Sequence, residues 1–564
     1  MKASKRVGAL PAGGKASARS AAQRDWWDLT QRDWLLLALI AIASLAVQTF
    51  FLNYTVDDAF ITFRYSHNLV DGLGLAFNPG EHVEGFTNFL WMLYCAIPSF
   101  LGISVLWFSK VTLMILSAAN LFLMVRLFRR VAPNAPWWIS LVPPGVLALH
   151  TSFTLYAVNG IETQLFCFLV LLALYMAARE FDGGGWLSAI FFGLLFYTRP
   201  DGFMFFAITW LARLLFGRKD RSFLIWTSVF LAMAAGLTAF RLVYFGYPVP
   251  NTFYVKSAGT IKTRVSLWGI RYFRDMFRVA PNWFYLLLPL AGLAAWRRLS
   301  KFARFMVFVP YVYLVYVLYI GGDVNFPHFR FLLHVLPIMA IAALFPLLPR
   351  DKKAKPGRAL GFGRICGLVL SLACVVLQLR HSLVVWRSMN ATPESRPYRY
   401  LSLFPLSGSI SIYPEIARYL KENCDPGSVV VMQDVGAIPF YSGLKTFDII
   451  GLVNGPLAHY FYKMNYSDYL IDKLPEERVQ EIDKHVRDLV IDSVRADYVL
   501  YHTESGDPYD LGYSFHYHGL AYDSRFPDLY HPIAAFYYPA THRCDYVLFK
   551  RRTAASPEPP RAAD

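Results

Sequence analysis

Hydrophobic blocks follow one another along the chain from residue 34 to residue 380, and short polar or basic segments separate them. Since a helix needs about 20 apolar residues to cross a bilayer, each block predicts a transmembrane helix. The blocks lie at residues 34–52, 137–157, 163–179, 186–198, 203–216, 223–245, 283–296, 303–320, 329–349 and 361–380. Residues 86–125 add one net crossing, which we interpret as a span broken at Pro98 and Gly102 plus an interfacial piece. The pattern predicts an α-helical polytopic membrane protein with about eleven transmembrane helices.

Two of these blocks, at residues 186–198 and 203–216, are shorter than a full crossing. The segment between them, Thr198–Gly202, contains an arginine, a proline and an aspartate. We therefore expect two tilted half-helices around this polar turn.

After Arg380 the pattern changes to that of a water-soluble protein. Helical periodicity at Tyr413–Glu422 and Glu476–Leu489 alternates with short apolar runs that are typical of strands. These runs are Ser428–Met432, Thr446–Ile450, Tyr498–Tyr501 and Asp545–Lys550. The alternation predicts a small soluble α/β domain. The expected organisation is a basic tail (1–33), a transmembrane domain (34–380) with a first external loop at 53–88, the α/β domain (381–552) and a disordered tail (553–564).

Basic residues predict the orientation in the membrane. Seven Lys and Arg residues precede the first hydrophobic block, so the N-terminus is expected in the cytoplasm. Short basic loops at residues 126–130, 218–221, 297–304 and 350–358 are then cytoplasmic as well. This places the loop at 53–88 and the C-terminal domain outside the cytoplasm. The loop at 246–282 would also be external although it is basic; either the topology shifts there by one span, or the segment lies on the membrane against anionic lipid phosphate.

The composition agrees with a membrane protein. Of the 564 residues, 55% are hydrophobic and 17% are charged, against about 25% charged in an ordinary soluble domain. The net charge of +16 lies largely in the cytoplasmic loops and tails, where it meets anionic lipid, and nucleic-acid binding is therefore not expected. The six cysteines include no Cys-x-x-Cys pair, which leaves a zinc site unsupported. Cys424 and Cys544 are either a disulfide or two free thiols.

Carboxylates and cations gather at the external ends of the predicted spans. Asp57 and Asp58 follow the first span, where adjacent carboxylates can accept a proton, stabilise positive charge or hold a divalent cation. Arg64 follows six residues later and can bind phosphate or pair with the acids. The other external ends supply Glu84, Asn88, Glu162, Arg199, Asp201, Asn251, Lys256, Asp323, His328 and Arg330. A transporter would instead carry charges mid-span and in repeated halves, so the pattern indicates a site for a phosphorylated or polar substrate.

These motifs resemble those of the integral-membrane GT-C glycosyltransferases, in particular the terminal β-arabinofuranosyltransferase branch and its bacterial relatives. The resemblance covers the chain from about residue 55 to residue 455. It rests on Asp57-Asp58-Ala59-Phe60 with Arg64, on Phe77–Asn88, Gly160–Thr163, Arg199–Gly202, Tyr247–Thr252, Gly321–Asp323, Arg330-Phe331, Asp434–Tyr441 and Gly451-Leu452.

The resemblance implies a GT-C-like fold and an enzyme of the bacterial cytoplasmic membrane. Such an enzyme transfers a sugar, here a pentofuranose such as arabinofuranose, from a polyprenyl-phosphate donor to a cell-envelope glycan on the extracytoplasmic face. It implies that Asp57 or Asp58 is the catalytic carboxylate, with Asp58 preferred. The implied donor-phosphate ligands are Arg64, Arg199, His328, Arg330 and Lys256. The implied residues of the sugar and acceptor pocket are Glu84, Asn88, Glu162, Asp201, Asn251 and Asp323.

The mechanism leaves two points open at this stage. The aspartate is a base if the stereochemistry inverts, and a nucleophile or ion-pair partner if it is retained. No cofactor is required, because Arg and His can hold the leaving phosphate, although a divalent cation at the acid pair is compatible with the sequence. The alternative function is a flippase for a lipid-linked sugar, or a translocation partner, without transferase activity.

Overall fold

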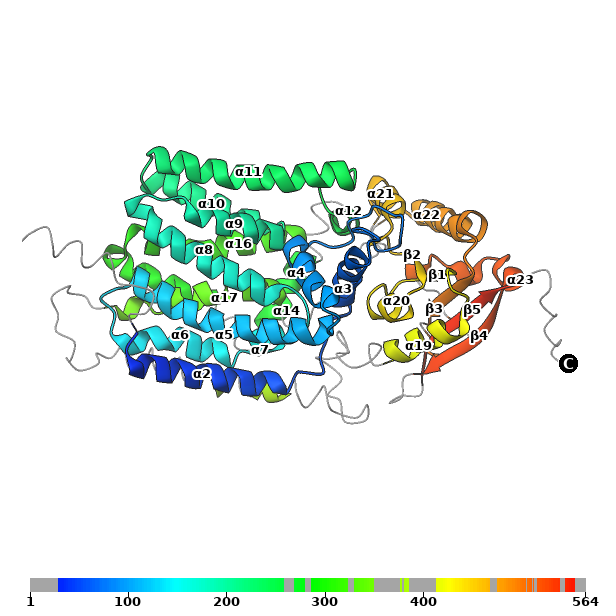
Figure 1. Ribbon diagram of the computed structural model, residues 1–564, viewed down its shortest axis with the longest axis horizontal. Coiled ribbons are helices and arrows are strands. Elements are labelled where there is room, and N and C mark those ends of the chain that lie inside the picture. Colours follow the sequence, from blue (N-terminus) through cyan, green and yellow to red (C-terminus); the bar gives the residue numbers. More distant parts are fainter. Residues whose placement is uncertain are drawn as a thin grey trace, which may run out of the picture.

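The protein consists of a helical bundle with a small sheet domain at one end (Figure 1). The computed structural model describes residues 29–257, 268–278, 286–322, 329–348, 376–377, 380–384, 412–466, 474–503, 505–509, 511, 515–537 and 543–552. The long helices run along the long axis of the molecule, and the sheet domain begins at α19 (Tyr413–Asn423). The expected boundary at residues 380 and 381 falls in a part of the chain that is described only at 376–377 and 380–384.

Six of the described helices are long and apolar enough to cross a membrane. They are α2 (Gln31–Thr49), α5 (Val105–Val131), α8 (Thr163–Gly183), α11 (Arg221–Tyr244), α16 (Lys301–Ile320) and the segment Arg330–Leu347, which holds α17 (Arg330–Ala342) and η4 (Phe345–Leu347). Shorter apolar helices accompany them, so the chain is a multi-pass membrane protein. The expected count of about eleven spans is not confirmed, and the predicted span at 361–380 lies almost entirely outside the described residues.

Several predicted spans differ in detail from the observed helices. Residues 137–157 do not form one helix but η1 (Trp137–Leu141), α6 (Val142–Ala148) and α7 (Thr151–Leu155). The predicted span at 283–296 is described from residue 286 and is mostly a 3-10 helix, η3 (Leu288–Arg298). Residues 86–125 form α4 (Phe89–Phe100) followed by α5. Pro98 lies inside the last turn of α4, so the break between the two helices falls after Phe100 and not at Pro98.

The half-helices expected around Thr198–Gly202 are confirmed as α9 (Leu187–Thr198) and α10 (Gly202–Phe216). With 12 residues, α9 is about 18 Å long and stops well short of a bilayer thickness. The hydroxyl of Tyr197 donates a hydrogen bond of 2.9 Å to the Met233 carbonyl in the middle of α11. Thr198, Arg199 and Asp201 are buried, so the polar turn between α9 and α10 lies inside the bundle.

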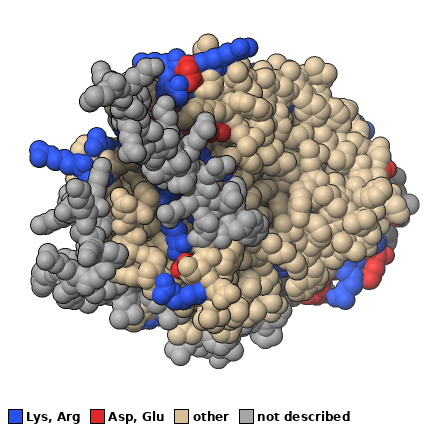
Figure 2. Space-filling view, turned by 60° about the vertical axis from the view of Figure 1, so that its left-hand side comes forward, with Lys and Arg blue, Asp and Glu red and all other residues tan. Residues whose placement is uncertain are grey.

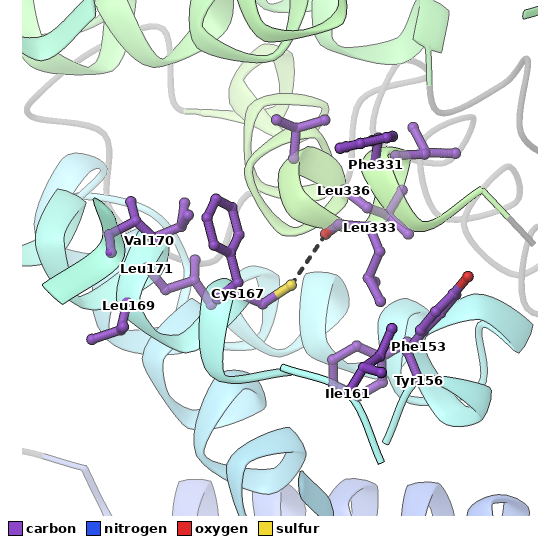
Figure 3. Packing of buried hydrophobic residues seen from close by; sticks show 14 of the residues in the cluster. Phe153, Tyr156, Ile161, Cys167, Leu169, Val170, Leu171, Phe331, Leu333 and Leu336 are labelled. Carbon is purple, nitrogen blue, oxygen red and sulfur yellow. Dashed lines mark hydrogen bonds between the residues drawn. The ribbon is translucent and has the colours of Figure 1, made fainter. Parts of the chain in front are cut away.

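The central helix of the bundle is α8, which packs against α5, α9 and α17. Its buried face packs against apolar side chains of α17 and of the segment that precedes α8, as Figure 3 shows around Cys167. The thiol of Cys167 donates a hydrogen bond of 3.5 Å to the Leu333 carbonyl, so the two helices approach closely. This packing fixes the ends of α8 and α17, which carry predicted site residues.

Exposed Lys and Arg side chains gather at the end of the bundle opposite the sheet domain, while the flank of the bundle shows few charges (Figure 2). The exposed basic residues of this end are Arg32, Arg130, Arg179, Arg218, Lys219, Arg221, Arg297 and Lys301. This distribution follows the positive-inside pattern read from the loops.

The sheet domain has one five-stranded sheet with the order β2-β1-β3-β5-β4. The strands are β1 (Val429–Met432), β2 (Lys445–Asp448), β3 (Tyr498–His502), β4 (Tyr530–Tyr537) and β5 (Cys544–Arg551). β1 pairs in parallel with β2 and β3, and β5 pairs antiparallel with β3 and β4. The helices α20 (Ala437–Ser442), α21 (Gly455–Lys463) and α22 (Glu476–Asp488) complete the domain.

The four predicted strands of this domain are confirmed to within a few residues, and β4 was missed. The alternation of inward and outward side chains along β4 is irregular, because its pairing with β5 shifts register twice. Cys424 and Cys544 are buried free thiols, so the alternative of a disulfide between them is wrong.

Candidate active site

The predicted first external loop contains a helix, α3 (Asp57–Val70), and the two aspartates form its first turn. Acidic side chains stabilise a helix N-terminus because they complement its dipole. Since successive residues of a helix lie about 100° apart, Asp57 and Asp58 point to different neighbours although they are adjacent in sequence. The acids therefore do not act as a pair on a flexible loop.

Asp57 lies on the face of α3 that meets the sheet domain. The Ala437 amide at the start of α20 donates a hydrogen bond of 2.8 Å to Asp57 Oδ1. Gly436 packs so closely on Asp57 that a Cβ atom at this position would overlap the Asp57 carboxylate and carbonyl oxygen. Burial raises the pKa of Asp57 to about 8, and the nearby carboxylates of Asp434 and Asp58 add to the rise, against the hydrogen bonds from Ala437 and Gly436. Asp57 is thus an interdomain contact.

Asp58 lies on the other face, together with Thr62 and Ser66 at helical spacing. Thr62 exchanges hydrogen bonds with Asn88, and the Ser66 hydroxyl donates 2.7 Å to the Met92 carbonyl, so this face meets α4 and the bundle. Within the described part of the chain, the half-buried Asp58 carboxylate accepts no hydrogen bond and forms no ion pair.

Arg64 has a structural position. Its guanidinium donates to three backbone carbonyls, those of Phe77 at 2.8 Å, Pro439 at 2.6 Å and Leu444 at 2.9 Å. Asp57 lies seven residues earlier on the same face of α3 and contacts the start of α20, so the two side chains contact both ends of α20. The expectation that Arg64 binds the donor phosphate does not fit this placement, because its guanidinium already joins the 77–85 segment to the sheet domain.

Four of the predicted pocket and phosphate residues meet in one buried network inside the bundle. The Asn88 side-chain amide donates a hydrogen bond of 2.8 Å to the Glu162 carboxylate. The same carboxylate accepts a hydrogen bond of 2.7 Å from the Arg199 guanidinium. Arg199 donates in turn to Asp201 at 2.9 Å. The network begins at Thr62, one turn from Asp58, and so connects the open face of α3 to the turn between α9 and α10.

Two residues that sequence reasoning missed extend this network. The Tyr313 hydroxyl donates 2.6 Å to Asp201 Oδ2 and lies 2.7 Å from His334 Nδ1. Both are fully buried, on α16 and α17, and His334 packs against Phe166 with ring centroids 4.3 Å apart. A polar residue inside an apolar span was the signal available in the sequence. Arg330 is also buried, at the start of α17, where its guanidinium lies 5.6 Å from the centre of the Phe331 ring.

Glu84 and Asn251 hold the rim of the site together. Glu84 forms a buried bidentate ion pair with Arg241 at 2.9–3.0 Å, and its carbonyl accepts the Asn251 amide at 2.9 Å. The Asn251 side chain donates to the carbonyls of Gly451 and Leu452 in the sheet domain, at 2.7 and 2.9 Å. The Glu84 carboxylate and the Asn251 side-chain nitrogen are thus bound to protein partners.

The remaining predicted residues are not gathered with the others by the described structure. Lys256 is exposed on α12 (Asn251–Ser257). Asp323 and His328 lie outside the described residues. Among the residues that the structure describes, no group of three or more His, Cys, Asp or Glu side chains could hold a metal ion.

Comparisons with known proteins support the architecture. A family model described as a domain of unknown function, DUF8728, matches residues 406–553. No curated protein matches the chain. The archaeal oligosaccharyltransferase AglB from Archaeoglobus fulgidus, in complex with an inhibitory peptide and a dolichol-phosphate, aligns at TM-score 0.52 and 12% identity over 90% of this chain and 80% of its own.

Two further solved structures align with most of this chain. ArnT from Cupriavidus metallidurans, bound to undecaprenyl phosphate, aligns at TM-score 0.50 and 11% identity over 94% of this chain and 100% of its own. The arabinofuranosyltransferase AftD from Mycobacteria aligns at TM-score 0.49 and 12% identity over 93% of this chain and 42% of its own, too low a likeness to bear on the sugar. By its likeness to AglB and ArnT, the chain has the fold of the GT-C integral-membrane glycosyltransferases.

Proposed function

We propose that this protein is a glycosyltransferase that uses a polyprenyl-phosphate sugar as donor and a cell-envelope glycan as acceptor. The donor class is supported by the folds it shares with AglB, in complex with a dolichol-phosphate, and ArnT, bound to undecaprenyl phosphate. The outer face of a bacterial cytoplasmic membrane is supported by the basic residues at the end of the bundle away from Asp57 and Asp58. A pentofuranose such as arabinofuranose is the sugar that the sequence resemblance favours.

Asp58 is the catalytic carboxylate in this proposal. A general base needs an oxygen within reach of the acceptor hydroxyl and must be ionised to take its proton. Asp57 meets neither condition well, because the Ala437 amide occupies one oxygen and a pKa of about 8 favours its protonated form at neutral pH. The free carboxylate of Asp58, on the face of α3 that leads to the buried network, is the observation that carries the assignment.

Arg330 is the favoured cation for the donor phosphate. Arg330 is buried and interacts electrostatically with the Glu162 carboxylate, which places it beside the network of Asn88, Glu162 and Arg199. Arg330 stands at the N-terminus of a 13-residue helix, where the helix dipole also favours an anion. A phosphate held there would leave readily once its charge is balanced, so that positioning and electrostatics supply most of the catalysis.

The test is sugar transfer in membranes that contain the wild type, Asp58→Asn or Asp57→Asn at equal protein level, with radiolabelled polyprenyl-phosphate sugars. We expect Asp58→Asn to lose transfer by roughly 10²- to 10⁴-fold, the usual contribution of a general base. Asp57→Asn is the matched control, because a carboxamide oxygen still accepts the Ala437 hydrogen bond; it should stay within about tenfold of wild type. Undiminished transfer by Asp58→Asn would remove this residue from the mechanism, and absence of transfer by the wild type with every donor would favour the flippase.

A further inference from the structure

Five rings form a cluster where α12 meets α21. Tyr247 stacks on His459 with ring centroids 4.0 Å apart, and Tyr254 lies 4.1 Å from the same imidazole. Tyr462 contacts Tyr254 at 5.4 Å and Phe253 at 6.5 Å. Tyr247, Phe253 and Tyr462 still expose 46%, 48% and 41% of their surface. Rings that are ordered against one another and yet so exposed mark a contact surface, which we call the α12–α21 aromatic surface.

The position of α11 sets the depth of this surface in the membrane. α11 is a peripheral helix with apolar side chains exposed along its length, including Leu224 at 66%, Leu231 at 53% and Val243 at 89%. Its 24 residues span about 36 Å, against a hydrocarbon core of about 30 Å. The C-terminal end of α11 therefore reaches the headgroup layer. Tyr247 follows three residues later, and α21 lies just beyond the same end of α11 (Figure 1).

The charged residues on α12 and α21 are positive. Lys256 on α12 and Lys463 on α21 are exposed, and neither helix contains an acidic residue. A sugar-stacking platform would need free amides or carboxylates beside its rings. The nearby side-chain amide nitrogens bind backbone carbonyls instead, since that of Asn251 donates to Gly451 and Leu452 and that of Asn454 donates to Asp448. Tyrosine with lysine is the composition of a membrane interface.

We propose that the α12–α21 aromatic surface rests in the headgroup layer of the leaflet beside the sheet domain and binds anionic phospholipid through Lys256 and Lys463. α21 belongs to the sheet domain, so this contact holds the domain against the bilayer. Lys256 then meets a lipid phosphate of the bilayer rather than the donor phosphate. The inference depends on the membrane fold and not on the proposed transferase activity.

The test is photocrosslinking of the full chain in nanodiscs of phosphatidylcholine with phosphatidylglycerol. The photoreactive residue p-benzoylphenylalanine is substituted for Tyr462 or Phe253, and lipid adducts are measured by mass spectrometry. Substitution of Val243, on the lipid-facing flank of α11, is the positive control. Substitution of Tyr522 is the negative control: it is 63% exposed and belongs to η10 (Leu520–Tyr522), which packs against α23 (Phe526–Leu529). The helix α23 lies at the end of the sheet domain far from the bundle (Figure 1).

We expect phospholipid adducts at positions 462, 253 and 243 and few at 522. Lys463→Gln should lower the phosphatidylglycerol adduct at position 462 by about fivefold, since one basic residue near an anionic surface contributes about a fivefold gain in affinity. Adducts at 243 without adducts at 462 and 253 would overturn the proposal. So would a crosslink from 462 to an added envelope glycan in place of lipid, which would make the rings an acceptor platform.

Discussion

Replacing Gly436 with alanine should separate α20 from α3. The new methyl group would overlap the carboxylate and the carbonyl oxygen of Asp57. Restoring ordinary van der Waals distance requires a displacement of roughly 1 Å, because carbon and oxygen atoms do not pack much closer than about 3.5 Å. The movement breaks the hydrogen bond from the Ala437 amide to Asp57 and displaces the first turn of α3, which also carries Asp58.

The substitution Gly436→Ala should lower both the folding stability and the rate of sugar transfer. Overpacking of this kind costs roughly 1–3 kcal/mol of folding free energy. A displacement of about 1 Å in a catalytic group costs on the order of 10²-fold in rate. We therefore expect a folded protein with sugar transfer lowered by roughly 10²-fold, and faster hydrogen exchange at the Ala437 amide.

The assay combines sugar transfer with hydrogen exchange followed by mass spectrometry, so that one measurement does not depend on the donor sugar. Gly183→Ala is the matched control, because a Cβ atom at Gly183 meets no atom within 4 Å and the residue lies at the end of α8 away from the site. Wild-type transfer together with unchanged exchange at Ala437 in Gly436→Ala would refute the proposed contact between α20 and Asp57.

Two further predictions concern Asp57 and Tyr313. The pKa of Asp57 is raised from 3.8 to about 8 on folding, so its contribution to stability is complete below about pH 4 and is lost as the pH rises to about 8. Thermal unfolding of Asp57→Asn should lack this part of the pH dependence. Curves of melting temperature against pH that run parallel for the wild type and Asp57→Asn would contradict the prediction. Tyr313→Phe removes the hydrogen bond to Asp201, so we expect it to lower the folding stability by about 1–3 kcal/mol. It should also lower kcat more than it raises KM. Tyr316→Phe, one turn away on α16, is the control, and equal effects of both substitutions would refute a role for the Tyr313 hydroxyl.

The sequence allowed much of the architecture to be predicted because hydrophobic length and charge act locally. Long apolar runs such as those of α8 and α11 must satisfy their backbone groups as helices in lipid. The prediction was wrong where tertiary packing replaced regular helix, as at 137–157, where three short helices fill the space beside α5 and α17. β4 was missed for a similar reason, since its register shifts against β5 disturb the alternation of a regular strand.

The predicted site residues divide in the same way. Glu162, Arg199, Asp201 and Asn88 were recognised as polar residues at span ends, and they do meet in one network. Their partners Tyr313 and His334 come from α16 and α17, more than a hundred residues away in sequence, so no local pattern could join them to Asp201. Arg64 was recognised as important from its spacing, but its three carbonyl partners depend on how the sheet domain docks.

The sequence by itself determined that this is a multi-pass membrane protein with a basic end, a soluble α/β domain and two adjacent acids after the first span. It did so because bilayer insertion and charge placement depend on composition along short segments. Only the tertiary structure gave the two acids different surroundings. Adjacent residues of a helix point about 100° apart, so Asp57 meets the α20 backbone while Asp58 faces the bundle, and which of them is left free depends on a domain almost four hundred residues further along the chain.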